Sequence, residues 1–304
     1  MKQRLPKTRR VPEAVASKKL TERSLAIIET IARYRFLLAR DIVRLVGGNE
    51  DVTHRHLQQL YHRDLINRFT LPAPRTGEFI YFLDNAAGLR QLADGSSLHG
   101  DLLDWGNIRT NREKYGDGAP RSVGRFLFIE HELMISSFHA DLDISARGDG
   151  GIEIKRWLQG AALWNNVRVA TKRTLPHRPD ALFTLHFPNA PEGQQHANFL
   201  YEADRETSSL TRMREKLEAH VQFFMQGKHI EAHGFRKLRA VLVETLSRER
   251  SRQLRELATD IAAQLPLAEM LFWFSCISLT DSLQSVHARR WTCAADDRLR
   301  SLAD

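Results

Sequence analysis

The spacing of apolar residues changes once along this chain, across a segment at residues 95–124 that is rich in Gly, Ser, Asn and Asp. Before that segment, apolar residues recur at helical spacing in three short runs, and two strand-like runs follow them. After it, one helical run precedes three strand-like runs, and helices then alternate with strands. A chain of 304 residues is long enough for two domains of ordinary size. The change therefore predicts two domains joined by a linker at 95–124.

The first pattern, over residues 21–94, predicts a winged helix-turn-helix domain. Its three helices begin after Thr21, near Leu38 and near Val52, and Gly47-Gly48 ends the second of them. The strand-like runs LINRFTL and EFIYFLD are separated by PAPRTG, which has the Pro and Gly residues of a turn. Three short helices followed by a hairpin are the elements of this DNA-binding fold.

The third predicted helix has one apolar face and one face of hydrogen-bond donors. At 100° per residue, Leu57 and Leu60 share the side that faces the core. The opposite side carries Arg55, Gln58, Gln59 and His62. Because arginine reads guanine and glutamine reads adenine in a major groove, this side predicts contacts to double-stranded DNA, with Arg75 at the tip of the wing beside it. The alternative is a solvated face in a winged helix that binds protein.

The net charge of +8 is concentrated near the N-terminus. Residues 1–23 contain eight Lys and Arg against two Glu, together with Pro6 and Pro12 and few apolar residues. A flexible basic arm over residues 1–20 is expected to bind DNA phosphates without sequence preference. Its candidate contacts are Lys7, Arg9 and Arg10. The alternative is an arm that only improves solubility.

Several classes of protein are excluded by composition and by missing motifs. With 42% hydrophobic residues the chain is globular, and no apolar run reaches the roughly 18–20 residues that cross a bilayer. Cys276 and Cys293 form no disulfide framework, and no apolar signal segment follows the N-terminal charges. No Gly-rich loop precedes a Lys and a Ser or Thr, so no nucleotide cofactor is expected. A cytoplasmic protein without a membrane partner is the expectation.

The second pattern, over residues 125–284, predicts a mixed α/β domain. Its helices are expected at about 125–143, 208–227 and 248–264, and residues 285–304 are expected to form a surface helix or tail. The predicted strands are GIEIKRWL, DALFTLHF, ANFLYEAD, LRAVLVET and EMLFWFSC.

Three carboxylates stand at the ends of two of these strands. Asp180 precedes DALFTLHF, and Glu202 and Asp204 end ANFLYEAD. Strand residues two apart project from the same face, so Glu202 and Asp204 are expected to lie together. With Asp180 they could hold Mg²⁺, which polarises a phosphate and activates water. Glu132, on the preceding helix, is an outer candidate for the same group.

With these residues in this order, the second domain resembles the PD-(D/E)xK nuclease-like fold. Over about residues 20–280, the chain resembles the replication-relaxation family of plasmid and other mobile-element proteins. This resemblance is carried by TERSLAIIETIARYRFLLARDIVRLV, by RPDA and by YEADRETSSLTRMREKLEAHVQFF. It implies DNA binding in plasmid replication, relaxation or mobilisation, without a defined enzymatic activity for the family as a whole.

The lysine of the nuclease pattern is missing from its usual place. It should follow the acidic residue by two positions and stabilise charge on the phosphate, but Asp204 stands there. Lys216, on the next helix, is a candidate for a displaced lysine, although a surface residue with its stem against the apolar stripe is the plainer interpretation.

We therefore expect a DNA-binding protein of a plasmid or mobile element, with an α+β fold of winged helix and nuclease-like domain. One alternative is a Mg²⁺-dependent DNA endonuclease that uses Asp180, Glu202 and Asp204, with Mg²⁺ as its cofactor. The other is a dimeric transcriptional regulator with a non-catalytic second domain, and a homodimer is compatible with the first expectation too.

Overall fold

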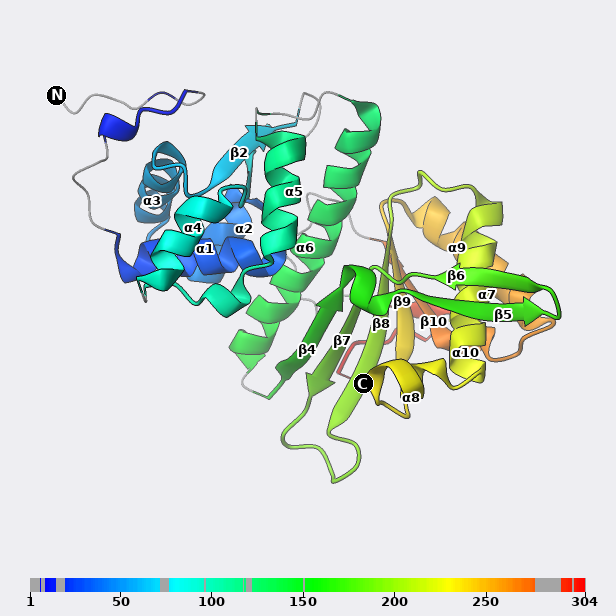
Figure 1. The fold of residues 1–304 in the computed structure, drawn as a ribbon. Coiled ribbons are helices and arrows are strands. Elements are labelled where there is room, and N and C mark those ends of the chain that lie inside the picture. Colours follow the sequence, from blue (N-terminus) through cyan, green and yellow to red (C-terminus); the bar gives the residue numbers. More distant parts are fainter. Residues whose placement is uncertain are drawn as a thin grey trace. The chain divides into compact units, whose positions relative to one another are not determined.

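The computed structural model of the chain describes residues 6, 9–14, 20–71, 77–95, 97–116, 118, 122–149, 151–276, 291–296 and 298–303. These residues form two compact units, Met1–Ala140 and Asp141–Asp304, called here the first and second units. The fold is mixed α/β, as predicted (Figure 1). None of the described helices combines the length and the apolar character that a membrane crossing requires.

The first unit consists of helices around a small antiparallel sheet of strand order β1-β3-β2. The strands are β1 (Leu37–Leu38), β2 (Asn67–Thr70) and β3 (Phe79–Phe82). The helices are η1 (Pro12–Ala14), α1 (Glu22–Tyr34), α2 (Ala39–Val46), α3 (Glu50–His62), α4 (Ala86–Asp94), η2 (Gly100–Leu102), α5 (Trp105–Tyr115) and most of α6 (Val123–Asp149).

Local signals in the sequence set the ends of the first three main helices. The Thr21 side chain accepts a hydrogen bond from the backbone N–H of Ser24 and starts α1, and Asn49 does the same for Val52 at the start of α3. Helix α2 ends where Gly47 adopts a φ of 71°, which costs glycine little because it has no Cβ.

The predicted linker at 95–124 is wrong in part, because it contains η2 and α5. Tyr115 at the end of α5 is buried against Phe36, Phe69 and Phe82. Helix α5 is mostly polar and buries only a narrow stripe, so its composition resembles that of a loop. Residues 97–116 therefore belong to the first unit rather than to a spacer.

The second unit is built on a six-stranded mixed sheet of order β11-β10-β9-β8-β7-β4. Strands β4, β7 and β8 are antiparallel neighbours, β8, β9 and β10 are parallel, and β11 is antiparallel to β10. The bounds are β4 (Glu153–Gln159), β7 (Ala181–His186), β8 (His196–Asp204), β9 (Ala240–Thr245), β10 (Phe272–Cys276) and β11 (Thr292–Cys293). The remaining elements are η3 (Gly160–Leu163), the separate hairpin β5 (Asn165–Ala170) and β6 (Arg173–His177), and α7 (Leu210–Met225), α8 (Lys228–His233), α9 (Arg248–Ala262) and α10 (Ala268–Leu271).

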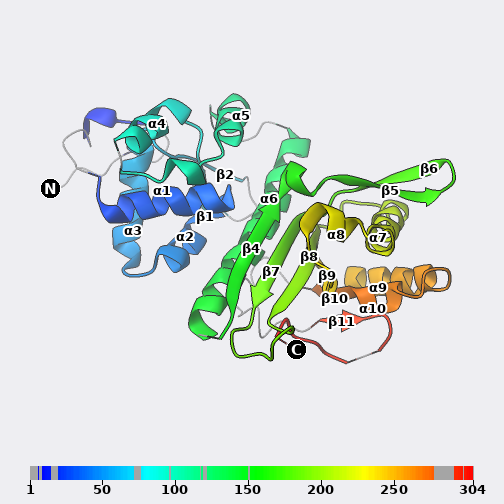
Figure 2. The ribbon, with the colours of Figure 1, turned by 60° about the horizontal axis from the view of Figure 1, so that its bottom comes forward.

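Helices α7 and α9 pack on one face of this sheet (Figure 2). Leu200 of β8 and Val241 of β9 lie in one buried cluster with Leu217 of α7 and Leu254 of α9. Burying this apolar surface is the main force that holds the two helices to the sheet. The buried apolar residues of the strands therefore face the helices. Because side chains alternate along a strand, Glu202 and Asp204 of β8 lie on the same side as Leu200.

Two parts of the second unit differ from the predictions. The hairpin β5–β6 was not predicted, and it packs on α7. The predicted surface helix or tail at 285–304 is wrong where the structure describes it, since Thr292 and Cys293 form β11 beside β10 and Trp291 is fully buried. The apolar run EMLFWFSC also begins as helix α10 and becomes a strand only at Phe272.

Candidate functional site

The exposed side of α3 is the first candidate surface. Leu57 and Leu60 are fully buried, as the helical spacing predicts, and Arg55 on the opposite side is exposed. Its guanidinium Nε donates to the backbone oxygen of Asp51, 3.3 Å away, and the side chain carries no other described bond. Gln58 and Gln59 are partly exposed on the same helix. Three of the four predicted donors are therefore accessible to solvent.

His62, the fourth predicted donor, is not on this surface. Its side chain is 0% exposed, and its Nδ1 accepts a hydrogen bond of 3.1 Å from the backbone N–H of Val11. Burial lowers the pKa of its ring, and the neighbouring Arg68 and Arg10 lower it further. The prediction that His62 contacts DNA is wrong for this arrangement, because a segment before the helices covers the end of α3.

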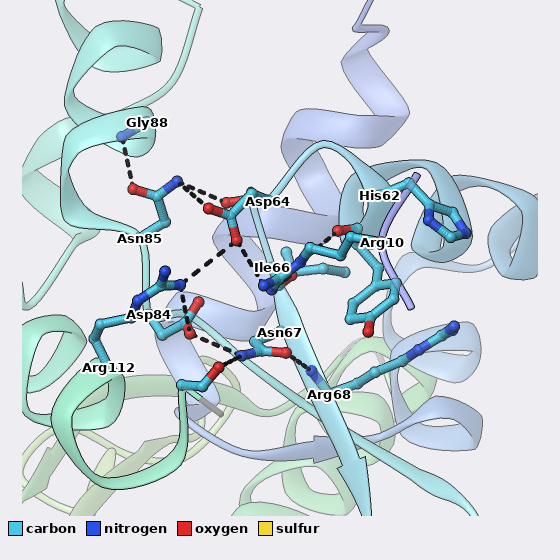
Figure 3. Close-up of polar contacts among 12 residues, drawn as sticks. Arg10, His62, Asp64, Ile66, Asn67, Arg68, Asp84, Asn85, Gly88 and Arg112 are labelled. Carbon is cyan, nitrogen blue, oxygen red and sulfur yellow. Dashed lines mark hydrogen bonds and ion pairs between the residues drawn. The ribbon is translucent and has the colours of Figure 1, made fainter. Parts of the chain in front are cut away.

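That segment contains part of the predicted basic arm. Arg10 forms an ion pair with Asp64 at 2.9 Å, and its Nε donates to the backbone oxygen of Tyr61 at 3.1 Å (Figure 3). Arg10 is therefore held by the first unit itself and is not a free phosphate contact, whereas Arg9 is exposed. The other predicted basic contacts, Lys7 and Arg75, lie outside the described residues.

Asp64 is the centre of this polar network. It has a φ of 59°, a left-handed conformation that Asp tolerates better than most residues, and it ends α3 without a glycine. Its carboxylate also lies 3.6 Å from Arg112 Nη1, and Asn85 donates to it at 3.1 Å (Figure 3). The network thus ties the end of α3 to the residues before α4 and to α5.

The second candidate is the carboxylate cluster of Asp180, Glu202 and Asp204 in the second unit. The backbone N–H of Asp180 donates to Tyr201 at 3.1 Å, and the Asp180 side chain accepts from the N–H of Ala203 at 2.9 Å. These bonds fix Asp180 beside the end of β8. Glu202 and Asp204 are both buried on the face that α7 and α9 cover.

Lys216 of α7 lies between two of these carboxylates. Its Nζ forms an ion pair with Glu202 Oε2 and lies 3.6 Å from Asp180 Oδ2. Although burial acts in the opposite direction, the two carboxylates raise the pKa of Lys216, so it stays protonated. The Lys216 side chain is 30% exposed, so it reaches the surface as in the plainer interpretation, but its ammonium group is paired with two carboxylates. Lys216 thus links Asp180 and Glu202 electrostatically.

Two buried histidines extend this group away from solvent. His220, one turn after Lys216 on α7, lies with Nε2 2.5 Å from Glu202 Oε1, and its Nδ1 is 2.9 Å from His177 Nε2. With both rings neutral and Glu202 ionised beside the Lys216 ammonium group, these distances are satisfied when His177 donates to His220 and His220 donates to Glu202. Burial lowers the pKa of His220 to about 3, with Lys216 adding to the effect, and it lowers that of His177 as well. Glu202 therefore has a cation on one oxygen and a neutral N–H donor on the other.

The neutral histidines predict a measurable pH dependence of stability. A histidine with a folded pKa below its unfolded value of 6.5 favours the folded state above that pH, and the contribution is lost as the pH falls. Replacing His177 with Phe keeps the stacking on Phe223, whose ring centroid is 3.9 Å away, and removes one such group. The slope of unfolding free energy against pH between about pH 6 and 4 should then decrease by about 1.4 kcal/mol per pH unit.

Urea denaturation at several pH values would measure this slope. The matched control is His196→Phe, because His196 is exposed in the same unit and is solvated in both states. An unchanged slope in His177→Phe would mean that His177 is not a buried neutral group.

Asp204 has a different cationic partner. Arg250, in the first turn of α9, donates through Nε to Asp204 Oδ2 at 2.6 Å and through Nη2 to the backbone oxygen of Ser208 at 2.7 Å. The backbone N–H of Glu206 donates to the other Asp204 oxygen at 3.1 Å. Glu202 and Asp204 thus share a face, as the strand spacing predicts, but each is neutralised by a different helix.

The cluster in this arrangement does not offer a ligand set for Mg²⁺. An oxygen-liganded ion needs several free carboxylate or carbonyl oxygens, and here Lys216 and Arg250 use those of Glu202 and Asp204. Among the residues that the structure describes, no group of three or more His, Cys, Asp or Glu is placed to hold a metal ion. Glu132, the outer candidate, pairs instead with Arg35 at 2.8 Å within the first unit.

Comparison with known families gives a match over most of the chain. The model of a family described as replication-relaxation matches residues 28–238, which include α3, Asp180, Glu202, Asp204 and Lys216. Searches of curated proteins and of solved structures found no match.

Proposed function

Because the chain belongs to the replication-relaxation family, we propose that it binds double-stranded DNA of a plasmid or other mobile element and acts in replication, relaxation or mobilisation of that DNA, or in their regulation. The observation that carries DNA binding is the exposed side of α3, where Arg55 projects opposite the buried Leu57 and Leu60. A helix with a buried apolar side and accessible Arg and Gln residues suits a major groove.

The neighbouring elements support the same proposal. Helices α1, α2 and α3 precede the antiparallel pair β2–β3, which is the order of a winged helix-turn-helix. The polar network around Asp64 fixes the end of α3 and would hold a recognition helix rigid against the rest of the first unit. Arg9, exposed before η1, is available for a phosphate contact.

Arg55→Ala tests the proposal. Duplexes that bind the full chain would first be selected from random sequence, and the affinity of each variant for the selected site would then be measured. We expect Arg55→Ala to weaken the selected site by about 5- to 150-fold, corresponding to about 1–3 kcal/mol, and to relax sequence preference at one base pair. The matched control is Arg109→Ala, which removes the same charge from an exposed position on α5.

Two outcomes would contradict this part of the proposal. Failure of the wild-type chain to bind any duplex at low salt would exclude DNA binding by the first unit. Equal losses of affinity for the selected duplex in Arg55→Ala and Arg109→Ala would show that Arg55 contributes only non-specific charge attraction. A selected site with two-fold symmetry that binds two copies of the chain would support the homodimer, and with it the regulator alternative.

A second candidate function is DNA cleavage, and the juxtaposition of Asp180, Glu202 and Lys216 favours it. Two carboxylates and a lysine at the ends of adjacent strands are the residue types of the nuclease pattern, with the lysine supplied by α7. Binding of Mg²⁺ would require Lys216 to move away from Glu202. The arrangement as it stands is a self-neutralised cluster, so we rank cleavage below DNA binding.

Incubation of supercoiled DNA with the chain in Mg²⁺, Mn²⁺ or EDTA tests the second candidate. Nicking that needs the metal and is lost in both Asp180→Asn and Glu202→Gln would support a nuclease. Glu153→Gln, at an exposed carboxylate on β4, is the matched control and should not change the rate. Binding of DNA without nicking in any metal would exclude this candidate.

A further inference from the structure

An exposed tryptophan follows β4 at the end of the sheet that carries the carboxylate cluster. Trp164 follows η3 and has 57% of its surface exposed, which is unusual for so large an aromatic residue. The guanidinium carbon of Arg178 lies 4.8 Å from the centroid of the Trp164 ring, a cation–π contact that orients both side chains at the surface. Leu163, immediately before Trp164, is buried with Leu217 of α7 and anchors this segment.

The strand register places this pair at the same end of the sheet as the cluster. Gln159, the last residue of β4, pairs with Ala181, and Ala181 pairs with Tyr201, the residue before Glu202. Adjacent strands are about 4.8 Å apart. The start of η3, Asp180 and Glu202 therefore lie side by side in one row across the ends of β4, β7 and β8. Arg178 precedes Asp180 by two residues, which limits their Cα separation to about 7 Å.

Further positive charge lies beside this row. Arg212, exposed on α7, precedes Lys216 by one helical turn on the same face, whereas Lys216 itself is neutralised by Asp180 and Glu202. Cations next to an exposed aromatic ring are the combination that binds single-stranded nucleic acid, in which bases stack on the ring and phosphates meet the charges. A protein partner that bound Trp164 through apolar contacts alone would not need the Arg178 guanidinium on the ring.

We propose that Trp164 and Arg178 form a stacking platform for an unpaired base, so that the second unit binds single-stranded or locally opened DNA, with the DNA backbone beside Arg212. This inference rests on the proposed function in taking DNA as the ligand, and it assigns the second unit a preference for unpaired strands. The duplex then contacts α3, and the unpaired strand contacts Trp164, Arg178 and Arg212.

The test compares full-length variants on matched DNA in EDTA, so that no strand is cut. The probes are a fluorescein-labelled single strand of about 20 nucleotides, longer than the usual site of one binding domain, and the duplex of the same sequence. Trp164→Ala should weaken the single strand by about 5- to 150-fold and change duplex affinity by less than about twofold. Trp164→Phe retains an aromatic face and should keep most of the affinity. The matched control is Met225→Ala, because Met225 is 59% exposed in the same unit.

A series of single strands, each lacking the base at one position, would identify the base that stacks on the Trp164 ring. The wild-type chain should lose affinity at one position of the series, and Trp164→Ala should be insensitive to that position. Equal affinity of wild type and Trp164→Ala for the single strand overturns the inference, as does an equal loss on single strand and duplex. Failure of wild type to bind duplex would instead remove the proposed function of the first unit, so the two failures are distinguishable.

Discussion

Replacing Lys216 with methionine is expected to lower the free energy of unfolding of the second unit by about 3–5 kcal/mol at pH 8. The substitution preserves most of the apolar stem and removes the ammonium group that lies against Glu202 and Asp180. Glu202 would then be a buried carboxylate with a second carboxylate nearby and no cation. Removing a charged group from water costs several kcal/mol when no partner compensates for the lost hydration. Urea denaturation followed by tryptophan fluorescence measures the loss.

The pH dependence separates this mechanism from loss of packing. Burial already raises the pKa of Glu202 above its ordinary 4.5, and removal of Lys216 should raise it further. A carboxyl group whose folded pKa is raised costs stability only above its unfolded pKa, so the deficit of Lys216→Met should grow from about pH 5 to pH 8. Adding Glu202→Gln should recover much of the loss. Lys155→Met, at an exposed ion pair with Glu153, is the matched control and should change stability little.

Arg250→Met is expected to cost a similar amount, about 3–5 kcal/mol, for a related reason. It leaves the buried carboxylate of Asp204 without its cation and the backbone oxygen of Ser208 without its donor. The same helix provides the control, since Arg252 pairs with Glu249 and Glu256 on the exposed side of α9. Arg252→Met should therefore leave the denaturation midpoint nearly unchanged, and equal midpoints for Arg250→Met and Arg252→Met would contradict a buried pair.

The helices and central strands were predictable because their signals are local. Thr21, Asn49 and Ser209 each bond a backbone N–H three residues later, which marks the first residue of a helix in the sequence itself. Strand β8 is a nearly continuous buried run, and its neighbours are similarly apolar. Helix α5 and the hairpin β5–β6 bury only narrow stripes, so their composition resembled loops.

The site was only partly predictable, because its partners are distant in sequence. The common face of Glu202 and Asp204 followed from strand alternation, but no local pattern predicts that Arg250, 46 residues after Asp204, would reach it. His177 and His220 are 43 residues apart and meet only because β6 and α7 pack together. The one available signal was the spacing of Lys216 and His220, one turn apart on the apolar side of a helix that follows the acidic strand end.

The strand order of the second unit has a consequence for how the protein is made. Along the sheet, β4, β7, β8, β9, β10 and β11 follow their order in the chain, and β5–β6 is a local excursion. Each strand can therefore dock on the one that left the ribosome before it, without waiting for a distant segment. Lys216 emerges soon after Glu202, but Arg250 follows Asp204 by 46 residues, which take about 2–9 s to synthesise at about 5–20 residues per second. Until Arg250 has been synthesised, Asp204 lacks the cation that neutralises it in the folded unit, and the sheet lacks the helix α9 that packs on it.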